Sequence, residues 1–195
     1  MITPLCRFTY ANVFEPKANL SGALKYSTGL LFPKTDTKAI AAVTKAIDDA
    51  IQAGVKKGTF NAAASKSRTF KHPLRDGDEY YATADESQRA NRECYRGMMF
   101  LNASNQNPIG VVDAHARPII NQEDFYSGCW GHADINFSAF NKGGSIGVGC
   151  YVNNVMKKKD DDRFDGRQSA EAAFVGYTDS DDSDDSDDSD GSDLQ

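Results

Sequence analysis

Two stretches in the C-terminal half decide the fold: GCWGHADINFSAFN (residues 128–141) and GSIGVGCYVNNVMK (residues 144–157). Both alternate apolar residues with polar or small ones, which is the period of a β-strand that has one buried face. The residues that join them, Asn141 to Gly144, spell NKGG, a strong signal for a hairpin turn. The sequence therefore predicts a long two-stranded hairpin.

The alternation gives each arm of this hairpin a core face and a second face. The core-facing residues are Cys129, Ala133, Ile135 and Phe137 in the first arm, and Ile146, Val148, Cys150 and Val152 in the second. The second face mixes aromatic with polar residues: Trp130, His132, Asn136 and Phe140, then Ser145, Gly147, Gly149, Tyr151 and Asn153. One side of the hairpin is thus available for something other than packing.

Further strands are expected on either side of a single long helix. They are predicted at residues 5–14 (LCRFTYANVF), 23–32 (ALKYSTGLLF), 94–102 and 109–113. The helix begins at Thr35 or Asp36, has apolar residues at three-to-four spacing, and is expected to end at Gly54 in a left-handed cap. Residues 56–92 are polar and aperiodic, which predicts a long loop with a short strand at Tyr80 and Tyr81. This pattern favours a mainly β domain with one or two helices, an OB-fold-like small barrel.

Charge divides the chain into two unlike parts. The whole chain of 195 residues has a net charge of −6, which argues at first against a partner that is itself a polyanion. However, residues 1–159 hold 20 Lys and Arg against 14 Asp and Glu, whereas residues 160–195 hold 2 against 14. A basic body with a strongly acidic end is typical of a protein that binds nucleic acid or a membrane surface and carries its own competitor.

Cysteine usage and hydropathy indicate a reduced, soluble protein. Four cysteines (Cys6, Cys94, Cys129 and Cys150) are scattered through the expected strands, with no CxxC pair and no signal peptide, so a disulfide framework is not supported. No apolar run approaches the ~20 residues that a membrane span needs. We therefore expect free thiols, no membrane partner and an intracellular location.

Aromatic residues interleaved with Lys and Arg indicate single-stranded nucleic acid, because bases stack on rings while cations follow the phosphates. For any single residue a structural role, in closing the barrel or in solvent, is slightly favoured; for the set as a whole binding is favoured. The candidate DNA-binding residues are Arg7, Tyr10, Lys17, Lys25, Tyr26, Lys34, Arg75, Arg96, Trp130, Phe140, Lys142, Tyr151 and Lys157.

Metal and catalytic patterns are weak. Cys129 and His132 are three residues apart on a predicted strand and so point to opposite faces, which is poor geometry for zinc. The stretch LRDGDE (residues 74–79) could be imagined as a nuclease carboxylate pair but is interpreted more simply as a tight turn. No nucleophile elbow, HExxH motif or phosphate-binding loop is present. We predict no metal, no cofactor and no enzymatic activity.

Eight ordered blocks carry a family resemblance across nearly all of residues 1–175. They are RFTYANVFEPK (7–17), LKYSTGLLFPKTD (24–36), LRDGDE (74–79), FLNAS (100–104), PIGVVD (108–113), YSGCW (126–130), INFSAFNKGGSIGVG (135–149) and VNNV (152–155). With these blocks the chain resembles the tailed-phage single-stranded DNA-binding family that was long filed as a domain of unknown function. The resemblance implies an OB-fold, coating of single strands during phage replication or recombination in the cytoplasm of the infected bacterium, and no catalysis.

The acidic end is expected to be a regulatory tail. Its sequence offers nothing apolar to bury, so residues 178–195 are predicted to be disordered and residues 1–177 to form the binding domain. The tail resembles those through which single-strand binders contact replication proteins, although it ends in Leu194 and Gln195 where many of them end in an aromatic residue. Its candidate regulatory residues are Asp179, Asp181, Asp182, Asp184, Asp185, Asp187, Asp188, Asp190 and Asp193.

An alternative of another class is a phage interaction or DNA-mimic protein that acts through this tail, with the body as a scaffold. The basic excess of residues 1–159 favours the DNA-coating function, since a mimic has no use for it. Oligomeric state is left open.

Overall fold

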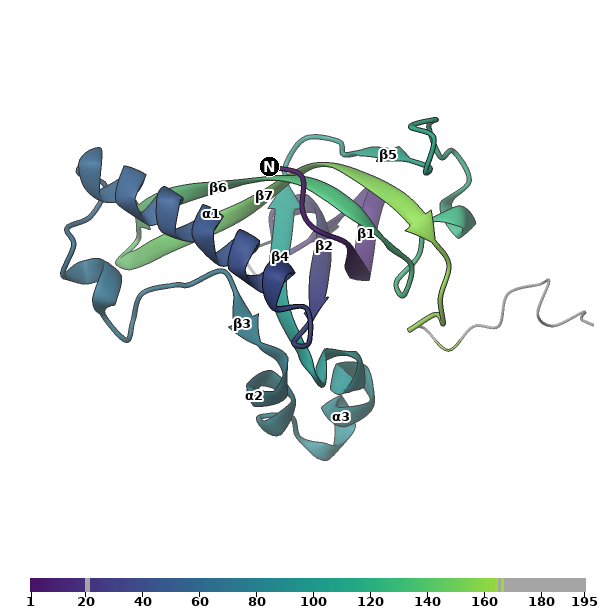
Figure 1. Ribbon diagram of the computed structural model, residues 1–195, viewed down its shortest axis with the longest axis horizontal. Helices are drawn as coiled ribbons and strands as arrows, with labels where there is room; N and C mark the ends of the chain where they lie inside the picture. Colours follow the sequence, from purple (N-terminus) through teal and green to yellow (C-terminus); the bar gives the residue numbers. More distant parts are fainter. Residues whose placement is uncertain (20–21, 165, 167–195) are drawn as a thin grey trace, which may run out of the picture.

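The computed structural model describes residues 1–19, 22–164 and 166, and these residues form one seven-stranded sheet with the strand order β3-β4-β2-β1-β6-β7-β5 (Figure 1). The strands are β1 (Cys6–Ala18), β2 (Leu24–Pro33), β3 (Arg75–Asp76), β4 (Met98–Asn105), β5 (Gly110–Val112), β6 (Trp130–Lys142) and β7 (Ser145–Lys159). The helices are α1 (Thr37–Lys56), α2 (Gly77–Ala82) and α3 (Glu86–Arg92), with short 3₁₀ turns η1 (Ala64–Lys66), η2 (Glu93–Tyr95) and η3 (Gln122–Asp124).

The long hairpin is confirmed as β6 and β7, paired antiparallel from Trp130–Lys159 at one end to Lys142–Ser145 at the turn. Both glycines of the turn have positive φ, +58° at Gly143 and +77° at Gly144, which explains why the sequence places glycine there. The predicted core faces are confirmed at six of their eight positions, where Cys129, Ala133, Ile135, Val148, Cys150 and Val152 are buried. Phe137 and Ile146, which lie nearer the turn, are only partly buried.

The sheet carries hydrophobic residues on both faces at the β2–β4 pair. Leu30 and Leu101 belong to the main core, whereas Leu31 and Phe100 lie on the opposite face with Tyr95, under α2 and η2. Neighbouring residues of one strand therefore serve two separate clusters, as the alternation of a strand requires. Each fully buried aliphatic or aromatic side chain contributes ~1.5–3 kcal/mol to folding.

The sheet is curved (Figure 1), but the described residues do not show it closed into the predicted barrel. The C-terminal end of β4 comes close to β7, where the Asn105 side-chain amide donates to the Val152 carbonyl at 2.8 Å. The strand pairings of the described residues contain no ladder between β4 and β7. The observed architecture is thus a mainly β sheet with α1 packed on one face of the hairpin and the α2–α3 pair beside β3 and β4 (Figure 1).

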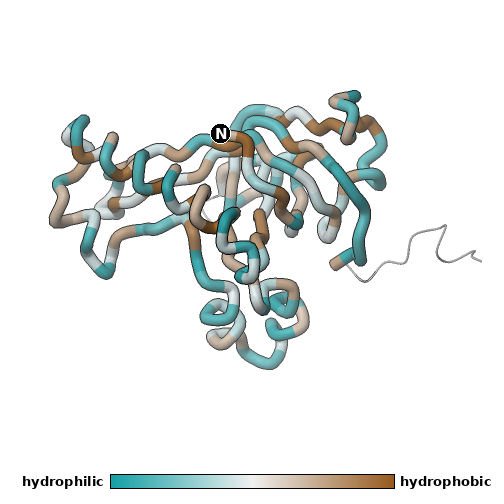
Figure 2. The backbone as a smooth tube through the Cα atoms, viewed as in Figure 1, coloured by the Kyte–Doolittle hydropathy of each residue, from teal (hydrophilic) through white to brown (hydrophobic). Residues whose placement is uncertain are grey.

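Helix α1 begins where the sequence predicts and ends later. The Asp36 carboxylate accepts a hydrogen bond from the Ala39 amide at 2.9 Å and caps the helix. Its apolar and polar residues alternate around the helix axis (Figure 2), and Val43 and Ile47 are fully buried. The prediction that Gly54 ends the helix is wrong. Gly54 lies inside it, and an added Cβ would come within 2.5 Å of the Ala139 side chain, so glycine is needed there for close packing against β6.

The prediction of a long loop over residues 56–92 is wrong in its second half. Residues 77–92 hold α2 and α3, and Tyr80 and Tyr81 are helical rather than in a strand. Aspartate caps explain the difference: Asp76 accepts from the amides of Asp78 and Glu79, and Asp85 accepts from that of Gln88. The LRDGDE stretch is therefore the end of a strand followed by a helix start, not a simple turn.

Smaller differences concern β4 and the cysteines. Strand β4 begins at Met98 rather than residue 94, because residues 93–95 form a 3₁₀ turn and Gly97 has φ +69°. All four cysteines are free thiols. Within the described ranges, no helix combines the length and apolar character needed to cross a membrane.

Candidate nucleic-acid interface

A groove runs between the outer face of β4 and the β6–β7 hairpin. It consists of two adjoining cavities of about 840 Å³ and about 540 Å³, which share Asn102, Gly149 and Cys150 as lining residues. The two cavities therefore adjoin at these three residues, and we call them together the groove.

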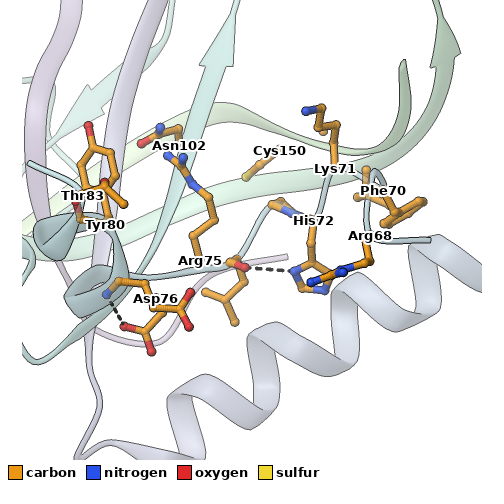
Figure 3. Close-up of a pocket in the computed structure, with 15 residues that line it drawn as sticks. Arg68, Phe70, Lys71, His72, Arg75, Asp76, Tyr80, Thr83, Asn102 and Cys150 are labelled. Atoms are coloured by element: carbon orange, nitrogen blue, oxygen red, sulfur yellow. Dashed lines mark hydrogen bonds between the residues drawn. The ribbon is translucent and has the colours of Figure 1, made fainter. Parts of the chain in front are cut away.

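Arg75 and Tyr80 form one wall of the larger cavity. In Figure 3 the Arg75 side chain extends from β3 toward Asn102 and Tyr80. Its guanidinium carbon lies 4.3 Å from the Phe100 ring centre and 5.4 Å from that of Tyr80, so the cation is held by aromatic faces. Asp76 and Glu79 also line this wall. The α2 side of the groove therefore carries both positive and negative side chains.

The opposite wall comes from the connection before β3, which holds none of the predicted DNA-binding residues. Its lining residues are Arg68, Phe70, Lys71 and His72 (Figure 3). Lys71 is bridged to Gly147 of β7, with its amide donating to the Ile146 carbonyl at 2.9 Å and its own carbonyl accepting from the Val148 amide at 3.1 Å. The signal that could have found this wall is the run SRTFKH (residues 67–72), where cations surround one aromatic ring.

The smaller cavity gathers four of the predicted residues: Lys25, Phe140, Lys142 and Tyr151. The side chain of Tyr151 is 42 % exposed, so its ring is available to a ligand. Lys17 lies beside this cavity as the antiparallel partner of Lys25. Together with Arg75, five of the predicted residues line the groove and a sixth adjoins it.

Lys34 supports the groove instead of lining it. Its ammonium nitrogen lies 2.6 Å from Oδ1 of Asp76 and 2.7 Å from Oδ2 of Asp78, and Oδ1 of Asp78 accepts from the Gly97 amide at 2.8 Å. Hydrogen bonds from Lys34 hold the pKa of both carboxyl groups below their usual value. These ion pairs connect the end of β2 to the start of α2 and so position the wall that carries Tyr80.

Three predicted residues lie together at the far end of β6, outside the groove, each already bonded. The guanidinium of Arg7 donates to the carbonyls of Gly128 and Asp162, both at 2.7 Å. The indole of Trp130 donates to Asp161 at 2.6 Å, and Lys157 pairs with Asp160 at 2.7 Å.

The remaining predicted residues are dispersed. Tyr26 packs against the main core, and Arg96 pairs with Glu93 at 2.7 Å. Tyr10 is 55 % exposed in an irregular part of β1, with the uncommon φ of +46°. The nine tail aspartates lie outside the described residues.

Histidine and cysteine side chains show structural rather than ligating contacts. Nδ1 of His132 lies 2.9 Å from the Thr3 carbonyl oxygen, and Nδ1 of His72 lies 3.0 Å from that of Leu74. Burial raises the pKa of Cys129 to about 11, which keeps this thiol protonated. Among the described residues, no three His, Cys, Asp or Glu side chains are grouped so that they could hold a metal ion.

Comparison with known structures finds the same fold in two phage proteins. The single-stranded DNA-binding protein of bacteriophage Enc34, solved in complex with single-stranded DNA, aligns with a TM-score of 0.64 at 23 % identity, over 84 % of this chain and 88 % of that one. The single-stranded DNA-binding protein gp2.5 of bacteriophage T7 aligns with a TM-score of 0.53 at 12 % identity, over 93 % and 95 % of the two chains.

Sequence comparison is more specific. Putative protein p50 of Acyrthosiphon pisum secondary endosymbiont phage 1 is 30 % identical over 170 residues, which cover 82 % of this chain and 83 % of that protein. The family described as "Enterobacter phage Enc34, ssDNA-binding protein" matches residues 1–187. The chain belongs to this family of phage single-stranded DNA-binding proteins, as its eight sequence blocks and its fold both indicate.

Proposed function

We propose that the groove holds the single strand, with bases stacked on its rings and phosphates on its cations. The observation that carries this proposal is that the two cavities adjoin at Asn102, Gly149 and Cys150. Cations and aromatic rings line both cavities. They are Arg68, Phe70, Lys71, Arg75 and Tyr80 in one cavity, and Lys25, Phe140, Lys142 and Tyr151 in the other.

Binding of this kind is largely independent of base sequence. Every base offers a face to an aromatic ring, and phosphates are the same at each step, so stacking plus charge coats a strand without reading it. This fits a protein that protects single strands while a phage genome is copied or recombined in the cytoplasm of its bacterial host. The family binds DNA and is not enzymatic. We further propose that the curved sheet acts as an OB-like barrel, with residues 1–177 as the binding domain.

The acidic residues 178–195 are proposed to compete with DNA, to recruit phage or host replication proteins, or to do both. Nine aspartates tethered to a basic domain are present at an effective concentration on the order of millimolar, and they offer charge but no bases. A single strand adds stacking to charge and should displace them, whereas duplex offers mainly phosphates.

A titration with labelled oligonucleotides tests the groove. The double variant Lys71→Gln with Lys142→Gln removes two exposed cations from its walls, and Lys38→Gln with Lys45→Gln removes two exposed cations from α1. The groove variant should bind single strands more weakly, and its salt dependence should fall by ~0.7 in log affinity per log salt for each phosphate that is no longer neutralised. If both variants change alike, or neither changes while both stay folded by circular dichroism, the groove is not the binding surface.

A further inference from the structure

A second basic and aromatic surface lies at the opposite end of β6 from the groove. It consists of Arg7, Tyr126, Trp130, Lys157 and Lys159, and we call it the Trp130 surface. Cations lie close to its rings: Lys159 Nζ is 5.0 Å from the Trp130 ring centre, and Lys157 Nζ is 5.1 Å from that of Tyr126. The alternation of cations and rings repeats the chemistry of the groove.

This surface is occupied by the chain's own carboxylates. Residues 160–164 (DDDRF), which we call the acidic strap, leave the end of β7 and lie across it. Oδ1 of Asp160 accepts from the Tyr126 hydroxyl at 2.6 Å and pairs with Lys157 at 2.7 Å. Oδ2 of Asp161 accepts from the Trp130 indole at 2.6 Å, and its Oδ1 lies 3.4 Å from the Arg7 guanidinium. Each carboxylate therefore satisfies one ring donor and one cation, as an anionic phosphate oxygen would.

The strap is anchored separately from these carboxylates. The Phe164 amide donates to the Ser127 carbonyl at 2.9 Å, and the Phe164 ring lies 4.3 Å from the Arg7 guanidinium carbon. An added Cβ on Gly128 would come within 2.2 Å of the Asp162 carbonyl oxygen, so the backbone here is fitted closely. The side chains of Asp160 and Asp161 could thus be displaced by a competing anion while the backbone stays in place, held also by hydrogen bonds from Arg7 to the Asp162 carbonyl and from Tyr126 to the Asp161 carbonyl.

The pKa shifts of Asp161 and Tyr126 agree with these hydrogen bonds and ion pairs. The hydrogen bond from Trp130 holds the pKa of Asp161 below its usual value. Burial, followed by the hydrogen bond to Asp160, raises the pKa of Tyr126 to about 12. At neutral pH Asp161 therefore stays ionised and Tyr126 stays protonated, as their hydrogen bonds require.

We propose that the Trp130 surface is a second contact site for single-stranded DNA, closed by the acidic strap, whose carboxylates occupy the positions of phosphates. The proposal rests on the groove being the primary site, because a strand bound there would supply the second contact at high local concentration. Strand β6 runs for 13 residues from Trp130 to Lys142, which is at most ~40 Å of strand. Only a long oligonucleotide can therefore reach both sites.

The test is the variant Asp160→Asn with Asp161→Asn in the full chain. The amide oxygens keep acceptors for Tyr126 and Trp130 but lose both ion pairs, which for partly exposed pairs corresponds to about a three- to tenfold gain in affinity. We expect that gain at low salt with a long oligonucleotide and no gain with one too short to leave the groove. Trp130 is the only tryptophan in the chain. Its fluorescence should change when the long oligonucleotide binds the variant.

Two controls separate this proposal from simpler effects. Asp48→Asn with Asp49→Asn on α1 removes the same charge away from the surface, so an equal gain there would show that only net charge matters and would overturn the proposal. Adding Trp130→Ala to the strap variant should cancel the gain, and a gain that persists would also overturn it. Failure of the groove itself would appear independently, as unchanged short-oligonucleotide binding in the Lys71 and Lys142 variant.

Discussion

Lys17 and Lys25 are direct antiparallel partners on β1 and β2, so two positively charged side chains lie next to each other on the same face of the sheet. Like charges in this position destabilise a sheet by a few tenths to ~1 kcal/mol unless an anion lies between them. Because Lys25 lines the smaller cavity, we expect the pair to hold a phosphate of the bound strand. Lys17→Gln should therefore weaken single-strand binding and leave thermal stability equal or slightly higher. A loss of stability together with unchanged binding would show that the pair has a structural role.

Tyr151 is expected to be a stacking platform. It is exposed and lines the groove, so Tyr151→Ala should cost ~1–3 kcal/mol of binding free energy with little change in the melting temperature. Tyr151→Phe keeps the ring and should bind like the native protein. Equal affinities for the alanine and phenylalanine variants would place the bases elsewhere. Fluorescence anisotropy with a labelled oligonucleotide measures both.

The ion pairs of Lys34 with Asp76 and Asp78 predict a pH effect on stability. The folded-state pKa values of Asp76 and Asp78 lie below the ordinary 3.8, so their contribution is present above that value and is lost as the pH falls through the lowered pKa. Lys34→Met removes the main cause of the shift. The free energy of unfolding of this variant, from urea melts between about pH 5 and pH 2, should therefore fall less steeply than that of the native protein. Parallel curves, with Lys38→Met as the matched control, would contradict this.

Thiol reactivity should single out Cys94. Burial raises the pKa of Cys6 and Cys150 to about 12 and that of Cys129 to about 11. Cys6 and Cys129 are fully buried and Cys150 is nearly so at the edge of the groove, whereas Cys94 is only partly buried. A thiol reagent that reports on free cysteines should label Cys94 first in the folded protein, and Cys6 and Cys129 only after unfolding. Cys94→Ser should abolish the early labelling. Rapid labelling of that variant would mean that the core opens more readily than its packing indicates.

Removing residues 179–195 should tighten binding to both single strands and duplex, and should help duplex proportionally more. The reason is that the tail competes through charge alone, while a single strand also stacks. The effect should vanish as salt screens the tail over a Debye length of ~8 Å. Equal affinities of the full and shortened proteins at low salt would leave the tail with partner recruitment as its role. Gel shifts with matched oligonucleotides at two salt concentrations provide the measurement.

Local sequence patterns determined the hairpin, its two faces and the start of α1. Alternation fixes which side of β6 and β7 is buried, and Asp36 caps the helix with its own side chain, so both depend on residues close together in the chain. The charge difference between residues 1–159 and the acidic end is likewise visible without a structure. The family resemblance rested on such local blocks.

The tertiary structure decided which aromatic and basic residues are free to bind. The alternation along the strands places both Trp130 and Tyr151 on polar faces. Trp130, however, donates a hydrogen bond to Asp161, 31 residues away, whereas Tyr151 is open to the groove. Lys34 is likewise taken by Asp76, 42 residues away. A residue's partners across such separations are set by the packing of whole elements, which no local pattern encodes. For the same reason the wall around Lys71 was missed, since only its bridge to β7 brings that polar connection to the site.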